Sequence, residues 1–584
     1  MKKIIFILTC LSTLGGHLVA QNPKWFKKAA KAQISIVTMN EKGDMLQSGS
    51  GFFIDKNGTA LADYQLFKQA SKAKVVSGEG KEYEVEAIVG VSSLYDLVKF
   101  RVKTDKDTPA LTISDRMGVK HEHVYVLPYP TKENKMCVND TLHDIQKFNE
   151  KYGYYTLGRP LDEKYLNSPV MDEEGEVLGM IQRKANASAT TSYAVSVAYG
   201  NTLFTNGMSS ADNDLNAIHI RKALPADEAD IRTFLFMTAS RSDSTTYNQY
   251  LNDYAEQFPK SSEPYTQRAD FYMAHGNYAA AEEDMNAAMD VAEKKDEVYY
   301  AFSKLLYELN LKPGYTVYKD WDMNKSLSLA GEAYKQNPLP LYTLQEGNTL
   351  YALKDYEKAF EKYLSLTGTN MRSANLFLYA AQCKRMAGAD TLQILALQDS
   401  AVACFSKPYL KDAAPALLER SNTLLALGRY RDAILDLNEY EHLMGDELTA
   451  YFYYRREQAE MQCRMFQQAV DDIDRAIRME PKEPLYHAER AVVYYRIGEF
   501  AEALSSAKKS AELNPEFGDA YRLMGICQLK LNRREESRRI GRRICTSHPD
   551  GRGNKAIDSI YYALPIRPCF RQGMAFLFYE PQPS

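Results

Sequence analysis

Two different spacings of hydrophobic positions divide the chain. From about residue 33 to residue 197, short β-rich runs alternate with Gly, Asn and Asp turns, a pattern typical of strands. From about residue 223 onward, Ala, Leu and Tyr recur at spacings of three and four beside paired charges, which predicts helices almost throughout. The polar, turn-rich segment 206–222 between them is the best linker candidate. The expected strands lie at 33–39, 50–54, 72–78, 83–91, 96–102, 123–129, 176–183 and 192–198.

The helical region repeats itself. Segments that begin at residues 263, 340, 414, 450, 484 and 520 align with one another, and Ala469, Ala503 and Ser537 stand 34 positions apart. A small residue on the second helix of each pair lets the first helix approach closely, and an aromatic ring fills the space beside it. The small positions are Ala281, Ala359, Ala433, Ala469 and Ala503, and the rings three residues earlier are Tyr278, Tyr356, Tyr430, Phe466 and Phe500.

This period and these positions resemble the tetratricopeptide repeat. The resemblance implies helix pairs that stack into a superhelix, because one pair cannot bury its apolar face alone. Diverged copies are expected at 225–260, 298–338 and 371–412. In the family, the concave groove of the superhelix binds peptides or helices, so a protein or peptide ligand is the expected partner.

Four segments of the strand-like region appear in an order known from another family. They read GSGFFIDKNGTALADYQLF (49–67), SSLYDLVKFRV (92–102), YLNSPVMDEEGEVLGMI (165–181) and SYAVSV (192–197). Residues 33–198 thereby resemble trypsin-like serine proteases and their HtrA-like bacterial branch. We therefore expect a multidomain chain, with an all-β trypsin-like double barrel over 21–205 and an all-α tetratricopeptide superhelix over 223–547.

The resemblance places the general base and the aspartate of the catalytic triad. Gln65 stands where the histidine belongs, and Asp96 matches the triad aspartate. The histidine precedes the aspartate in this family, yet no histidine lies between His17 and His121. A glutamine side chain cannot take a proton near neutral pH, so the position of the base is degenerate.

The nucleophile position is degenerate as well. Aligned on Pro169, Leu166 replaces the catalytic serine; if two glycines were deleted instead, Ser168 would take that place. In both alignments the paired glycines that let the backbone form the oxyanion hole are gone. The sequence thus predicts a protein-interaction or scaffold protein with an inactive protease domain and no cofactor. The alternative is an active serine endopeptidase whose repeats recruit protein substrates.

Other candidate sites are weaker. His121 and His123 stand two apart with Glu122 between them, as metal ligands on a strand can, but a solvated strand edge is favoured and no metal site is expected. Cys137 with His143 is a remote candidate for a thiol nucleophile and its base. The basic run 533–543 fits a solvated final helix better than a site for an acidic partner.

Composition and the N-terminus limit the classes of function. A chain of 584 residues is too long for one core, and a net charge of -4 argues against a general nucleic-acid binder. Residues 1–20 read as a signal peptide, with Lys2 and Lys3 before an apolar run and a cleavage site after Ala20, so export to the periplasm or beyond is expected. No later apolar run is long enough to span a membrane. The tail 548–584 has no repeat pattern.

Overall fold

The computed structural model describes residues 22–131, 136–183 and 190–547. The predicted signal peptide and the C-terminal tail lie outside these residues. The chain divides into two compact units, Met1–Glu293 and Lys294–Ser584, and each is described by itself. Within the described residues, no helix combines the length and the apolar character that a membrane crossing requires.

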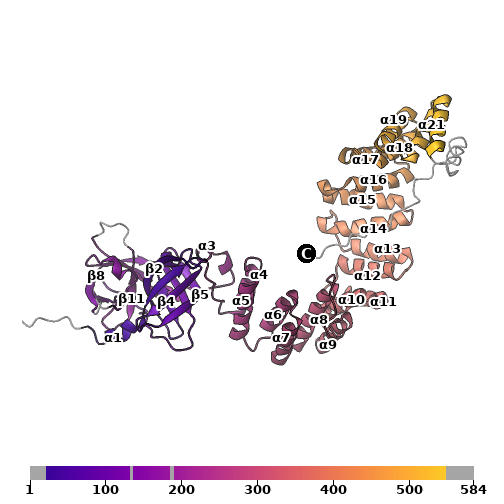
Figure 1. The fold of residues 1–584 in the computed structure, drawn as a ribbon. Coiled ribbons are helices and arrows are strands. Elements are labelled where there is room, and N and C mark those ends of the chain that lie inside the picture. The colour runs from indigo at the N-terminus through magenta and orange to yellow at the C-terminus, as the bar shows by residue number, and fades with distance from the viewer. Residues whose placement is uncertain (1–21, 132–135, 184–189, 548–584) are drawn as a thin grey trace, which may run out of the picture. The chain divides into compact units, whose positions relative to one another are not determined.

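The strands of the first unit close into two six-stranded antiparallel barrels (Figure 1). Around the first barrel the order is β1-β2-β3-β6-β5-β4, and β7 to β12 follow the same order around the second. The double barrel expected from the sequence is therefore confirmed. The first barrel contains β1 (Gln33–Met39), β2 (Met45–Phe53), β3 (Thr59–Ala62), β4 (Lys72–Ser77), β5 (Glu82–Ser92) and β6 (Leu97–Val102). The second contains β7 (His123–Val126), β8 (Val138–Phe148), β9 (Tyr152–Leu157), β10 (Pro169–Met171), β11 (Val177–Ile181) and β12 (Tyr193–Ser196).

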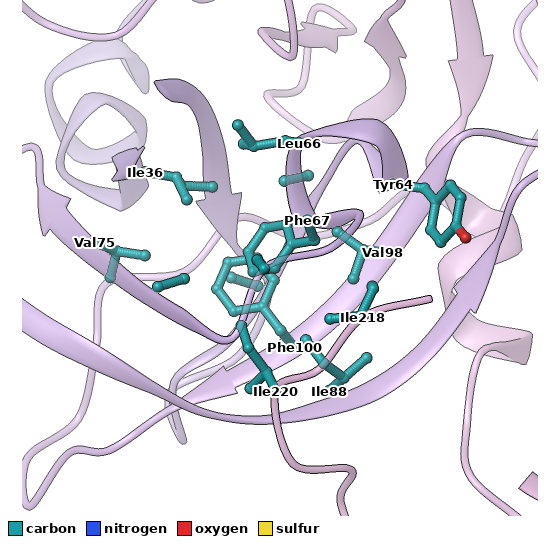
Figure 2. Packing of buried hydrophobic residues seen from close by; sticks show 14 of the residues in the cluster. Ile36, Tyr64, Leu66, Phe67, Val75, Ile88, Val98, Phe100, Ile218 and Ile220 are labelled. Carbon is teal, nitrogen blue, oxygen red and sulfur yellow. The ribbon is translucent and has the colours of Figure 1, made fainter. Parts of the chain in front are cut away.

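The core of the first barrel is filled from alternate strand positions and from one short helix. Strand β6 turns Val98 and Phe100 inward, as its alternating apolar pattern requires. Helix α2 (Tyr64–Phe67) follows β3 and adds Phe67, whose ring centroid lies 4.8 Å from that of Phe100 (Figure 2). The corner that follows β3 is thus a structural part of the barrel core.

The segment 206–222 packs along the first barrel. Leu215 of the short helix α3 (Asn213–Asn216), Ile218 and Ile220 are buried in the barrel core, and Figure 2 shows the two isoleucines beside Ile88. The backbone of the segment is also hydrogen-bonded to strand β5. The Ile88 N–H donates to the Arg221 carbonyl at 2.8 Å, and the Ala223 N–H donates to the Ile88 carbonyl at 2.7 Å. Although the segment is mostly polar, its three buried apolar side chains are part of the core of the first barrel.

Limited proteolysis with trypsin tests this packing. We expect the bonds after Arg221 and Lys222 to resist cleavage, because Arg221 pairs with Asp253 and the Lys222 ammonium donates to the Ile218 and Ile220 carbonyls. Exposed Lys319, in the connection between two later helices, should be cut first. Mass spectrometry of the early fragments decides the matter, and a first cut at Arg221 or Lys222 would contradict the packed segment.

Helices follow the barrels in consecutive pairs. The first unit continues with α4 (Glu228–Ala239), α5 (Ser244–Gln257), α6 (Glu263–Ala274) and α7 (Tyr278–Val291). The first half of the second unit contains α8 (Lys295–Leu311), α9 (Met323–Gln336), α10 (Pro340–Ala352), α11 (Tyr356–Leu366), α12 (Ala374–Met386), α13 (Thr391–Val402) and α14 (Ala414–Ala426). The rest contains α15 (Tyr430–Met444), α16 (Ala450–Gln462), α17 (Phe466–Met479), α18 (Pro484–Ile497), α19 (Phe500–Leu513), α20 (Gly518–Lys530) and α21 (Arg534–Ser547).

The repeat positions behave as the sequence predicts. Each predicted copy, including the three diverged ones, is a helix pair. The five small residues are fully buried, and each of the five rings begins the second helix of its pair; the alanines are Ala281, Ala359, Ala433, Ala469 and Ala503. A larger side chain at these alanines would force the paired helices apart, which is why the spacing is visible in the sequence.

Candidate functional site

The corner that holds the histidine position is built by Asp63 and helix α2. Asp63 caps the helix, since its carboxylate accepts the Leu66 N–H at 2.5 Å. Gln65 follows on the exposed side of the helix, and its backbone N–H donates to the Asp96 carboxylate at 3.2 Å. The structure thus brings the positions of base and aspartate together, but through the backbone of Gln65.

Asp96 has the surroundings of a structural carboxylate. Its backbone is left-handed, with φ at 50°, and its side chain is half-buried. Burial raises the pKa of Asp96 above its usual range, and the nearby charge of Asp63 raises it further, while the N–H of Gln65 opposes the shift. The carboxylate therefore serves to hold the corner after β3 in place.

The nucleophile segment lies at the start of β10. Leu166 is half-buried, whereas Asn167 and Ser168 are buried, with Ser168 only 1% exposed. The backbone of Asn167 is left-handed, with φ at 64°, a conformation that asparagine tolerates better than most residues with a side chain. Of the two candidate nucleophile positions, one has an alkyl side chain and the other has little access to solvent.

The backbone N–H groups of this segment are all bonded within the protein. The N–H of Leu166 donates to the Glu163 carbonyl at 2.9 Å and that of Asn167 to the Ile181 carbonyl at 2.9 Å. The N–H of Ser168 donates to the Tyr165 carbonyl at 3.0 Å. An oxyanion hole needs N–H donors that point at the substrate, and these three donors point at carbonyls of the same chain.

Asn167 ties the nucleophile segment to the histidine corner. Its side-chain amide donates to the Asp63 carboxylate at 2.5 Å, across 104 residues of sequence. Nearby, the Ser50 hydroxyl donates to the Leu166 carbonyl at 2.8 Å. Sequence reasoning assigned no role to Asn167; its one signal is an asparagine where the family has a glycine, which suggests a left-handed backbone.

An aromatic cluster lies beside Asp96. The ring of Tyr95 stacks on Tyr199 with centroids 3.8 Å apart, and Phe148 and Tyr152 approach its edge or face. The Gln182 side chain donates to the Tyr95 carbonyl at 2.8 Å. These rings come from both barrels, so they pack the barrels against each other next to the triad positions.

The weaker candidates do not assemble into a site. His121 and His143 have ring centroids 6.4 Å apart, and the Nδ1 atom of His123 lies 3.9 Å from a carboxylate oxygen of Glu173. No group of three His, Cys, Asp or Glu side chains in the described part of the chain is arranged to hold a metal ion. Burial raises the pKa of the Cys137 thiol to about 12, and Cys137 lies six positions, about 20 Å along the strand direction, before His143. The thiol dyad is therefore contradicted.

A second polar feature recurs in the helical repeats. In three helix pairs an arginine on the first helix forms a bidentate ion pair with an aspartate 16 residues later on the second. The pairs are Arg268–Asp284, Arg420–Asp436 and Arg456–Asp472. Arg456 is the most buried of the three arginines, with a side chain 6% exposed. These pairs join the two helices of a repeat and lie within the repeat packing.

Two family models match separate parts of the chain. Residues 49–180 match the trypsin-like peptidase domain, and residues 458–515 match the tetratricopeptide repeat. Among solved structures, the serine endoprotease from Yersinia pestis aligns with a TM-score of 0.26 and 15% identity, over 30% of this chain and 62% of that chain.

Similar curated proteins share sequence with parts of this chain. The Hsp70-Hsp90 organizing protein of Triticum aestivum is 29% identical over 223 residues, which is 36% of this chain and 35% of the relative. Protein SGT1 homolog of Bos taurus is 34% identical over 62 residues, which is 11% of this chain and 18% of the relative. Small glutamine-rich tetratricopeptide repeat-containing protein 2 of Mycosarcoma maydis is 29% identical over 77 residues, which is 13% of this chain and 22% of the relative.

The chain thus spans only 18% to 35% of the length of these relatives. The two matched family models fall on the two architectures of the fold, one on the barrels and one on the helix pairs. The chain therefore joins a trypsin-like peptidase domain to tetratricopeptide repeats.

Proposed function

We propose that this protein is an exported protein-interaction or scaffold protein whose peptidase domain has lost catalysis. The hydrogen bonding of the nucleophile segment carries the proposal, because its three consecutive N–H groups donate to Glu163, Ile181 and Tyr165. A tetrahedral intermediate formed there would lack the preorganised donors that supply much of the rate enhancement in acyl transfer.

The side chains support the same proposal. Gln65 replaces the general base, and glutamine neither gains nor loses a proton near neutral pH. Ser168 is buried, and the other aligned position, Leu166, has no nucleophilic atom. Three of the four chemical requirements of the triad mechanism are therefore unmet, namely the base, the accessible nucleophile and the oxyanion donors, and only the aspartate position is kept.

The helical repeats supply the binding function. Stacked helix pairs of this family present an extended concave surface, and a protein or peptide ligand is its natural occupant. The name of one partial relative, the Hsp70-Hsp90 organizing protein, describes a protein that organises other proteins, in keeping with such a role. Export rests on the N-terminal sequence, in which two lysines precede an apolar run.

A reactivity assay tests the loss of catalysis. We expect no labelling of the purified protein by a serine-reactive fluorophosphonate and no cleavage of unfolded casein, with trypsin as the positive control. A Ser168→Ala variant is the matched control, and it should behave like the native chain in both assays. Labelling or cleavage that Ser168→Ala abolishes would instead establish the active endopeptidase.

A second experiment tests binding separately. Immobilised native protein is exposed to cell-envelope extract, and bound proteins are compared with those on a variant in which Arg456 is replaced by Met. We expect at least one partner that the native chain retains and the variant, whose repeat packing is weakened, retains less. Equal retention of every bound protein would count against the repeats as the binding element.

A further inference from the structure

Helices α16 and α18 meet through a bridge of three side chains. The Gln458 amide on α16 donates to the Glu457 carboxylate at 2.6 Å and to the Glu489 carboxylate, on α18, at 3.1 Å. Glu457 is fully buried and Glu489 is 8% exposed. One amide group therefore links two buried carboxyl groups from different repeats.

One acceptor in the bridge and one beside it are unsatisfied. The second oxygen of Glu457 has no hydrogen-bond partner, and neither does one oxygen of Glu460, which lies one turn further along α16 and is 3% exposed. A buried ionised carboxylate without such partners is costly, whereas a protonated carboxyl group gains a donor and loses its charge.

The surrounding cations do not neutralise the bridge. Arg456, the buried arginine of α16, donates to both oxygens of Asp472 and to Glu441, so its guanidinium is already engaged. The charged groups that act on the bridge and on Glu460 are Glu441 on α15, Arg456 on α16, Asp471 and Asp472 on α17, and Asp519 on α20. Arg475 on α17 pairs with Glu441, and Arg522 on α20 pairs with Asp519. Carboxylates thus outnumber arginines around this contact.

We propose that the folded repeats hold at least one proton between Glu457 and Glu489, and that release of this proton to water loosens the contact between α16 and α18. While the proton is bound, one carboxyl group is neutral and the Gln458 bridge joins an acid to a carboxylate. After its release, two buried negative charges face each other across one amide. The contact between these repeats is therefore sensitive to pH.

The direction of the pH dependence follows from proton linkage. Burial raises the pKa of Glu457 and of Glu489 well above the ordinary glutamate value of 4.5, and it raises the pKa of Glu460 to about 8. Because the folded state binds these protons more tightly than the unfolded state, their stabilisation is fully present below pH 4.5 and is lost as the pH rises through about 7 for Glu489 and about 8 for Glu460.

Hydrogen exchange of the full-length protein tests the proposal without any substitution. Amide protection is measured by mass spectrometry at about pH 6 and about pH 9 and corrected for intrinsic exchange. Relative to α10 and α11, the helices α16 and α18 should lose at least about tenfold in protection at the higher pH. Equal changes in both pairs of helices would overturn the proposal.

Variants then assign the effect to the bridge. In Glu457→Gln and, separately, Glu489→Gln, the shape of the side chain is kept and one charge is removed, so the extra loss of protection at high pH should shrink by about tenfold. Glu516→Gln, at an exposed glutamate near the start of α20, should leave the native pH response unchanged. If both bridge variants keep the full pH response, the proton is held elsewhere and the proposal is wrong.

Discussion

Replacing Arg456 by Met should destabilise the α16–α17 helix pair by about 3–5 kcal/mol, the usual cost of breaking a buried ion pair by removing one partner. The guanidinium donates to both oxygens of Asp472, which is 3% exposed, and it packs against the rings of Phe452 and Tyr453. Methionine keeps much of the volume but leaves the Asp472 carboxylate buried without its cation. Native-state hydrogen exchange of α16 and α17 measures the loss.

Two further variants separate charge from packing. Arg420→Met breaks the same bidentate geometry, to Asp436, but the Arg420 side chain is 21% exposed, so water replaces part of the lost interaction and the effect should be smaller. The double variant Arg456→Met with Asp472→Leu removes both charges and should recover most of the stability. If the double variant is as unstable as the single one, packing rather than the unpaired carboxylate accounts for the loss.

Replacing Phe67 by Ala should destabilise the first barrel by about 3–5 kcal/mol, because a buried aromatic side chain is lost and a cavity remains. Phe67 is fully buried against Phe100 at the corner after β3. The corner would thus prove to be a core element even though its histidine position contains glutamine. A brief protease pulse at increasing urea concentration, with detection of cuts within residues 33–102, reports the unfolding midpoint.

The control for this prediction is an exposed ring in the same unit. Phe204 is 64% exposed, and Phe204→Ala should change the free energy of unfolding by no more than about 0.5 kcal/mol. A small effect of Phe67→Ala, comparable with that of Phe204→Ala, would mean that the corner after β3 can detach from the barrel without cost.

The strands that the sequence predicts are those with regular apolar alternation. β1 is found over its expected range, and β6 begins one residue after the start of its expected range. Both agree closely because their inward positions are consistently apolar. β8, β9 and β10 were not expected. β8 places the polar Asp140 inward, where the carboxylate accepts the Gly158 N–H at 3.0 Å, and most of its other side chains are exposed. A polar residue in the core position removes the period on which the prediction depends.

The site was predictable in position but not in detail. Resemblance to a family placed Gln65 near Asp96, and the backbone hydrogen bond between them agrees with that placement. The roles of Asn167 and of the bonded N–H groups depend on the path of a loop that has lost its glycines. Spacing along the chain does not specify which carbonyl accepts each N–H, so no sequence pattern predicts this arrangement of hydrogen bonds.

The bonded amides at the start of β10 limit how the fold could regain chemistry. Putting histidine at Gln65 and serine at Leu166 would restore two side chains, yet the amides of residues 166, 167 and 168 would still donate to Glu163, Ile181 and Tyr165. Re-engineering an enzyme from this scaffold must begin with the loop, by reinserting glycines so that its backbone turns outward. Side-chain substitutions alone would leave these three amides bonded within the chain.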